Sequence, residues 1–201
     1  MTTPALVLLG AAAVAAASLA AARRGIGSVR VPTFAVPRGS ERAGVRYAFT
    51  TAFLPWAKES ASAHLATYLA GIVYHAGIFT ALLWLALTLA APALPRAVAA
   101  PLAVLLALAL SCGIGLLIKR HARADLRAVS VPDDTVANLL VDLALAAGAA
   151  AALAPAAVPL FQLAGAALLL YAPLGKLRHM LFLVTSRRQW GRFYGRRGVR
   201  G

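Results

Sequence analysis

Four histidines and one cysteine are the side chains here that most readily bind a transition metal: His64, His75, His121, His179 and Cys112. A single cysteine excludes a disulfide framework, a CxxC metal site, a cysteine-ligated iron–sulfur cluster and a covalently attached c-type haem. His75 and His179 lie within apolar stretches, whereas His64 and His121 lie nearer the edges of such stretches. Because a neutral imidazole in an apolar medium needs a partner for each ring nitrogen, His75 and His179 are the first candidates for a metal.

Two chemistries are open to these histidines. Two imidazoles from different helices can bind one haem iron, which leaves no open position for a substrate and limits the iron to electron transfer. Each histidine can instead be a hydrogen-bonded packing residue within the membrane. Gly71, Ala76 and Gly77 surround His75 and would let a flat macrocycle approach the helix backbone, although such residues also line ordinary helix contacts.

The composition indicates the elements that must position these side chains. Of 201 residues, 61% are apolar and 13% are charged, with a formal net charge of +14 and a mean hydropathy of +0.78. A soluble domain of this length could not bury so much apolar surface. Proteins that bind nucleic acid spread their basic charge over a polar surface, so no nucleic-acid partner is expected. The lipid bilayer is the expected surrounding.

Apolar stretches of about the length that crosses a bilayer occur five times. We expect an all-α integral membrane protein, a single membrane domain over 1–201 built as a bundle of five transmembrane helices. The expected spans are approximately 4–22, 66–91, 102–118, 135–153 and 159–184. Arg23 and Arg24 follow the first stretch instead of preceding it, so we interpret it as a retained helix and not as a signal peptide.

The basic residues predict the orientation. Nineteen of the twenty lysines and arginines fall on one side of the five expected spans, and Arg96 is the exception. The positive-inside rule places that side in the cytoplasm, with the N-terminus outside and the C-terminus inside a cytoplasmic (inner) membrane. Residues 23–65 would form a cytoplasmic surface segment and 185–201 a basic cytoplasmic tail. This face would contact anionic lipid headgroups, dock a cytoplasmic partner subunit, or both.

Three segments, in this order, carry a family resemblance: YHAGIF at 74–79, KR at 119–120 and PLGKLRH at 173–179. Together they resemble the gamma subunit of respiratory nitrate reductase and the related haem b membrane subunits of heterodisulfide-reductase-like and sulfite-reductase-associated complexes. The segment PWAKESASAH at 55–64 resembles these related haem b subunits more closely than it resembles the nitrate reductase subunit. The resemblance covers all five expected spans and rests on the order and spacing of the segments.

The resemblance implies a cytochrome b subunit that carries electrons between the quinone pool and a cytoplasmic iron–sulfur or other redox subunit. It places the axial ligands of one b haem near the cytoplasmic side on His75 and His179. The family's second, distal haem would fall on Leu85 and Phe161, neither of which can bind iron. One haem b is therefore expected, with quinone as a diffusible substrate, and the distal haem is doubtful.

Alternatives stay open at several positions. His64 could replace His75 as the ligand, or lie beside a haem propionate or a quinone. Lys176 and Arg178 could neutralise haem propionates, or extend to lipid headgroups. Asp142 could pair with a hydroxyl or basic partner, or take part in quinone-linked proton transfer. The whole chain could also be a haem-free anchor that holds a larger complex at the membrane.

Overall fold

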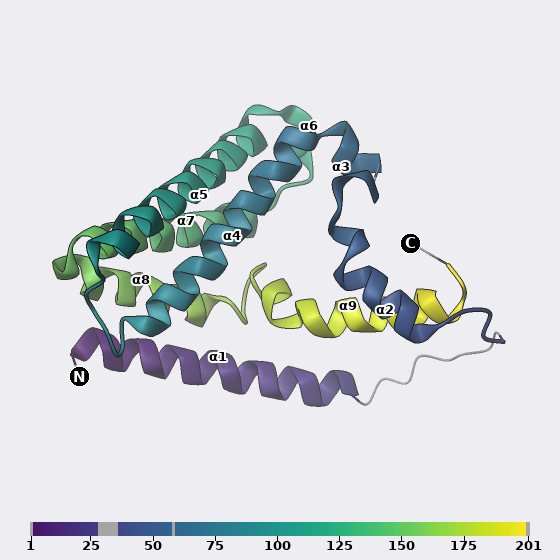
Figure 1. Cartoon of the computed structure of the whole chain (residues 1–201), viewed down its shortest axis with the longest axis horizontal. Helices are drawn as coiled ribbons and strands as arrows, with labels where there is room; N and C mark the ends of the chain where they lie inside the picture. The colour runs from purple at the N-terminus through teal and green to yellow at the C-terminus, as the bar shows by residue number, and fades with distance from the viewer. Residues whose placement is uncertain (1, 28–35, 58, 200–201) are drawn as a thin grey trace. The chain divides into compact units, whose positions relative to one another are not determined.

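A computed structural model describes residues 2–27, 36–57 and 59–199, and every regular element among them is helical. The described helices, labelled in Figure 1, are α1 (Thr3–Gly27), α2 (Glu41–Phe49), α3 (Glu59–Ala63), α4 (Leu65–Leu87), α5 (Arg96–Ala122), α6 (Ala124–Ala128), α7 (Pro132–Leu153), α8 (Val158–Tyr171) and α9 (Arg178–Arg196). Short 3₁₀ turns lie at Thr51–Phe53, Pro55–Ala57 and Pro155–Ala157.

The chain divides into two compact units. The bundle unit comprises Met1–Ala17 and Leu69–Leu177, and the hairpin unit comprises Ser18–Tyr68 and Arg178–Gly201. The sequence predicted a single domain with a surface segment over 23–65 and a basic tail over 185–201. The described residues of that segment and of that tail all belong to the hairpin unit, while Arg30, Lys58 and Arg200 lie outside the described residues.

Four described helices are long and apolar enough to cross a membrane, namely α1 over Thr3–Ala22, α4, α5 and α7. They coincide with the first four stretches expected from the sequence, and α5 extends beyond its expected limits of 102–118 at both ends. An all-α, multi-pass membrane protein is the fold class that these helices support.

The fifth expected span is not one helix. The sequence predicted a helix over 159–184, whereas α8 ends at Tyr171 and α9 begins at Arg178. Pro173 has no N–H to continue the backbone ladder, and its ring opposes the carbonyl one turn earlier. Gly175 then turns back on Tyr171 so closely that a Cβ at Gly175 would lie 2.2 Å from its ring. With 14 residues, α8 is about 21 Å long and shorter than a bilayer core.

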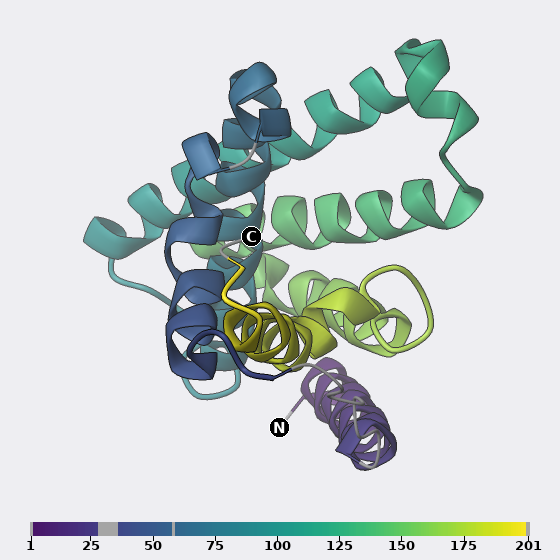
Figure 2. The same ribbon diagram turned by 90° about the vertical axis from the view of Figure 1, so that its right-hand side faces the viewer.

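Small residues let the helices of the bundle unit pack closely. Leu106 and Ala109 of α5 are completely buried, and Leu145 of α7 is nearly so. A Cβ at Gly77 of α4 would lie 2.1 Å from the Cβ of Ala109, so only glycine permits this approach of α4 to α5. Figures 1 and 2 show α5 beside α7, with α8 folding back along α7.

Two aspartates at the start of α7 hold the neighbouring helix ends. Asp134 caps the helix by accepting a hydrogen bond from the Val131 N–H at 3.0 Å. It also pairs with Lys176 Nζ at 2.6 Å and with Arg120 at 3.4 Å. Asp133 accepts hydrogen bonds from the Tyr171 hydroxyl and, at 2.8 Å, from the Lys176 N–H. The turn after α8 is therefore tied to the end of α5 through the start of α7.

The hairpin unit is built on α2 and α9, which lie against each other in opposite directions (Figure 1). Their backbones touch where both helices carry glycine: a Cβ at Gly44 would lie 2.1 Å from the Gly191 carbonyl oxygen, and one at Gly195 would lie 2.8 Å from the Gly44 Cα. Gly191 and Gly195 are four residues apart and share one helix face, the spacing that allows close helix crossings. Glu41 of α2 pairs with Arg192 at 2.9 Å and Arg196 at 3.4 Å.

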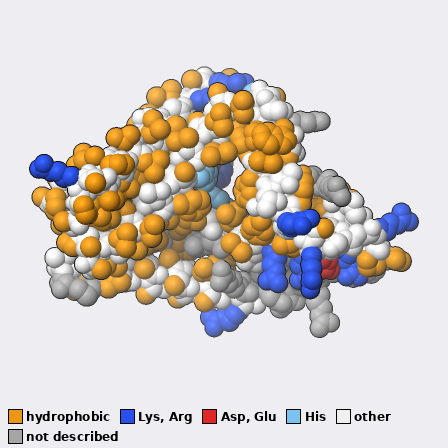
Figure 3. Space-filling model, in the orientation of Figure 1, with side chains coloured by type: hydrophobic (Ala, Val, Ile, Leu, Met, Phe, Trp, Pro, Cys, Tyr) orange, Lys and Arg blue, Asp and Glu red, His pale blue; other side chains and the backbone are white. Residues whose placement is uncertain are grey.

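The two units differ in the surface that they present. On the face drawn in Figure 3, hydrophobic side chains cover α4 and α5, whereas lysine and arginine side chains gather around α2 and α9. Within the hairpin unit, large apolar side chains such as Trp56 and Trp190 are also exposed. Exposed apolar surface on α4 and α5 agrees with helices that face lipid, and mixed basic and aromatic surface is typical of a membrane–water interface.

Candidate functional site

His75 lies near the middle of α4, and its ring is oriented by its own helix. Its Nδ1 is 2.7 Å from the carbonyl oxygen of Gly71, one turn earlier. Because a carbonyl can only accept, Nδ1 carries the proton, and Nε2 holds the lone pair that could bind a metal. Nε2 makes no hydrogen bond to any described residue, and the side chain is exposed. This backbone hydrogen bond is of the kind that fixes the tautomer of metal-binding histidines.

One face of α4 packs inside the bundle unit, and the candidate ligand His75 lies on another, exposed face. Tyr74, Gly77 and Ala81 are buried in the bundle unit, while His75 is exposed. The sequence suggested that Gly71 and Gly77 both leave room for a macrocycle. Gly77 instead packs against Ala109 of α5, whereas a Cβ at Gly71 would meet no atom within 4 Å. Open space therefore lies beside Gly71, the residue that orients His75.

The second predicted ligand, His179, lies in the first turn of α9 and is exposed. It belongs to the hairpin unit, while His75 belongs to the bundle unit, so the structure describes each histidine within its own unit. Arg178 is also exposed and forms no ion pair with a described carboxylate. Lys176 lies one residue before the end of the bundle unit, and its amine is bound to Asp134.

The other two histidines have different surroundings. His64 is exposed at the turn between α3 and α4, at the edge of the hairpin unit. His121 lies in the last turn of α5, where its Nε2 is 3.1 Å from the Thr135 hydroxyl of α7. The sequence places His121 only at the edge of an apolar stretch, and this contact gives it a partner in the bundle unit.

The described residues offer no conventional cluster for a bare metal ion. Nowhere in ranges 2–27, 36–57 and 59–199 do three or more His, Cys, Asp or Glu side chains come together in a way that could hold one. A haem needs fewer ligands from the protein, because its porphyrin supplies four nitrogens and the chain supplies only the axial positions. The exposed Nε2 of His75 is a nitrogen of the kind that can bind at such an axial position.

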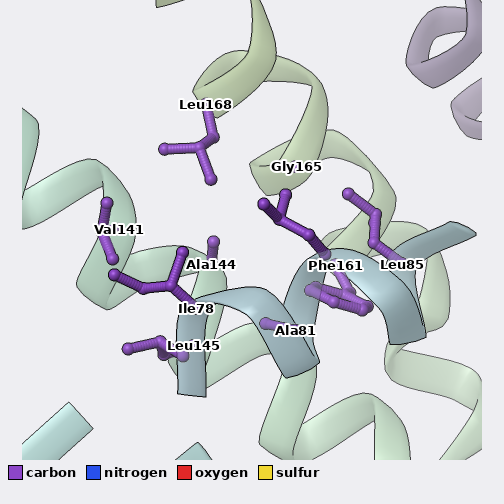
Figure 4. A pocket seen from close by; sticks show the side chains of 10 residues that line it. Ile78, Ala81, Leu85, Val141, Ala144, Leu145, Phe161, Gly165 and Leu168 are labelled. Carbon is purple, nitrogen blue, oxygen red and sulfur yellow. The ribbon is translucent and has the colours of Figure 1, made fainter. Parts of the chain in front are cut away.

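The two positions implied for a distal haem meet in one small apolar pocket of the bundle unit. Leu85 of α4 and Phe161 of α8 are 4% and 1% exposed, and both side chains line the pocket shown in Figure 4. Its volume is about 10 Å³, roughly that of a single water-sized probe and far below that of a porphyrin. A Cβ at Gly165 would lie 2.3 Å from Leu85 Cδ2, which shows how tightly side chains fill this position.

A buried polar network lies on the packed face of α4. Asp142 of α7 is 6% exposed and accepts hydrogen bonds from the Tyr74 hydroxyl at 2.9 Å and the Asn138 amide at 2.7 Å. The sequence left Asp142 open between pairing and proton transfer, and its described partners are a hydroxyl and an amide. Sequence reasoning missed Asn138, although its place one turn before Asp142 on the same helix face was a usable signal.

The same stretch of α4 therefore carries both a satisfied buried network and an exposed, oriented imidazole. No protein-family model, curated protein or solved structure matches this chain. The resemblance of segments 74–79 and 173–179 to haem b membrane subunits thus stays a prediction. A functional proposal therefore depends on the chemistry and geometry of the residues described above.

Proposed function

We propose that the chain is a membrane cytochrome b subunit that binds one haem b through His75 and His179. In this proposal it passes electrons between the quinone pool and a cytoplasmic iron–sulfur or other redox subunit. The observation that carries the proposal is the His75 ring, whose Nδ1 is held by the Gly71 carbonyl while Nε2 stays exposed. A packing histidine in a membrane helix would be expected to satisfy both nitrogens.

The proposal includes a topology. The four long apolar helices would cross the membrane, and α8 with the turn after it and the start of α9 would make a fifth crossing. The N-terminus would lie outside, and the C-terminus and most of the lysines and arginines would lie on the cytoplasmic side, as the positive-inside rule favours. His179 would then lie near the cytoplasmic surface, on the side where a redox partner docks.

A bound b haem would supply one-electron chemistry, since its iron alternates between two oxidation states. Gly71 would keep the His75 tautomer fixed so that Nε2 faces the iron. Arg178 is the better candidate to neutralise a propionate, because the Lys176 amine is already bound to Asp134. The packed face of α4, anchored by Gly77 and Tyr74, would hold the imidazole in place.

Substitution of each histidine tests the ligand assignment. We expect His75→Ala and His179→Ala to lose haem and His64→Ala to keep it, measured as b-type absorbance in reduced-minus-oxidised spectra. Each variant is checked for helix content by circular dichroism, because loss of haem from an unfolded chain carries no information about ligands. Haem loss in His64→Ala with retention in His75→Ala would show that His64 is the ligand.

A ligand exchange separates a direct role of His75 from a structural one. His75→Met preserves an axial ligand but replaces imidazole by thioether, which raises the reduction potential of a b haem. We expect this variant to retain haem with a more positive midpoint potential. An unchanged potential would mean that His75 does not bind the iron. A wild-type protein without b-type absorbance would favour the haem-free anchor instead.

A further inference from the structure

The hairpin unit contains an open pocket of about 1130 Å³ along α2 and α9. Its floor is formed where the glycines of the two helices meet, since Gly44, Gly191 and Gly195 contribute no side chains. A pocket of this size slightly exceeds the usual range of small-molecule sites, about 300–1,000 Å³. It lies wholly within residues of one unit, so its shape belongs to the hairpin itself.

Three arginines line this pocket without a carboxylate to balance them. Arg38, Arg46 and Arg187 form no ion pair with any described carboxylate. Arg187 donates a hydrogen bond to the Ala48 carbonyl at 3.0 Å and lies over the Phe53 ring at 4.2 Å, contacts that position its charge without neutralising it. The pocket is therefore suited to an anion.

Glu41 does not neutralise these arginines, although it lies in the same hairpin. Its carboxylate is bound to Arg192 and Arg196, neither of which lines the pocket. Because Glu41 is engaged in these two ion pairs, the positive charges of Arg38, Arg46 and Arg187 on the pocket wall are not balanced by it.

The rest of the lining points to an amphipathic anion. Tyr47, Trp190 and Tyr194 contribute aromatic surface, and Leu183 contributes aliphatic surface. Trp190 is 63% exposed, as expected for an aromatic residue at the level of lipid headgroups. An acidic protein segment would satisfy the arginines, but a phosphate linked to acyl chains satisfies both the arginines and this apolar surface in a membrane protein.

We infer that the pocket between α2 and α9 binds an anionic phospholipid, with Arg38, Arg46 and Arg187 at the headgroup phosphate. The aromatic residues lie along the glycerol and the first part of the acyl chains. Recognition depends on a headgroup whose phosphodiester charge is not cancelled by a cation, so phosphatidylglycerol is preferred to zwitterionic phosphatidylcholine. The site lies in the hairpin unit and does not depend on a haem.

Native mass spectrometry of the full chain in detergent tests this site with phosphatidylglycerol and phosphatidylcholine of the same acyl chains. We expect phosphatidylglycerol to bind about tenfold more tightly or better, because each basic residue near a headgroup adds to the attraction. The double variant Arg38→Gln, Arg46→Gln removes two pocket charges whose side chains hold no described structural contact. It should bring phosphatidylglycerol down to the level of phosphatidylcholine.

The matched control is Arg42→Gln, Arg188→Gln, which removes the same charge from exposed positions on the same two helices outside the pocket. It should keep the preference for phosphatidylglycerol. Equal binding of the two lipids, or equal loss in both double variants, would overturn the proposal. Complete displacement of phosphatidylglycerol by millimolar inorganic phosphate would also overturn it, since the site would then recognise a free anion. Preserved lipid preference in a haem-free preparation would support it whatever the outcome for the histidines.

Discussion

The bundle and hairpin units differ in how their charged side chains are paired. In the bundle unit, three aspartates of α7 are each engaged: Asp133 and Asp134 hold helix ends and Asp142 accepts from Tyr74 and Asn138. In the hairpin unit, Glu41 is the one carboxylate with described ion pairs, and its two partners leave other arginines of α2 and α9 unbalanced. The aspartates of α7 are therefore paired within the bundle unit, whereas several arginines of the hairpin unit have no described carboxylate partner.

Both units use glycine for close helix contact, but with different consequences. In the bundle unit, Gly77 brings α4 onto α5 inside a core that also contains Leu106 and Leu145. In the hairpin unit, Gly44 and Gly191 bring two backbones together with little apolar side chain between them. The hairpin should therefore depend on its glycines more than the bundle depends on any one of its own.

The largest predicted effect is at this glycine contact. In Gly44→Leu, the Cβ would fall 2.1 Å from the Gly191 carbonyl oxygen, and this backbone atom cannot turn aside. We expect a loss of about 3 kcal/mol or more in hairpin stability. Trypsin cleavage within α9 should accelerate strongly while cleavage in the bundle unit stays slow.

A glycine in open space provides the control. A Cβ at Gly115 of α5 would meet no atom within 4 Å, so Gly115→Ala should be neutral, or stabilising by about 0.5–1 kcal/mol, since alanine favours a helix. Wild-type proteolysis rates in Gly44→Leu would show that α2 and α9 are not held by backbone contact.

An intermediate effect is expected from the buried network of the bundle unit. Asp142→Leu leaves the Tyr74 hydroxyl and the Asn138 amide without their acceptor, at a cost of about 1–3 kcal/mol. Asp142→Asn retains an oxygen for one of the two donors and should lose less. The measurement is the thermal unfolding midpoint in detergent. Equal midpoints for Asp142→Leu and wild type would contradict a stabilising role for the hydrogen bonds of Asp142.

The smallest effect is a pH dependence confined to the hairpin unit. The hydrogen bond from Arg192, followed by its charge and by Arg196, lowers the pKa of Glu41 below its ordinary value of 4.5. A lowered pKa in the folded state means that the carboxylate stabilises the hairpin at neutral pH and that this contribution is lost as the pH falls below 4.5. Protection of α9 from an acid-active protease should therefore fall slightly between pH 6 and pH 3.

The matched variant for this titration is Glu41→Gln. It should show weaker protection at neutral pH and no change with acidification from this group. A Glu41→Gln hairpin that still loses protection over the same pH range would assign the effect to another residue.

Helix type and the first four spans follow from the sequence because long apolar stretches have few alternatives in a bilayer. The division after Tyr171 was missed, although Pro173 and Gly175 stand in the sequence, since apolar residues continue on both sides of them. The contact of α2 with α9 was not predicted. This contact joins segments about 150 residues apart in the sequence. The spacing of Gly191 and Gly195 indicates that another helix crosses closely there, but it does not identify that helix.

At the candidate site, the sequence singled out His75 but not the state of its ring. The tautomer depends on a hydrogen bond to the Gly71 carbonyl, and the helix brings this carbonyl, four residues earlier, next to the His75 ring. Gly77 was assigned to the space around His75 because it is adjacent in sequence, yet it faces α5. Neighbours in sequence point to different faces of a helix, so proximity along the chain is a poor guide to a shared site.

The most direct test of the central proposal is the haem content of the purified full chain, measured by pyridine haemochrome against protein concentration. We predict one b haem per chain in the wild-type protein, and none in His75→Ala or His179→Ala variants that retain wild-type helix content. A wild-type chain purified from haem-replete cells without b haem would contradict the account.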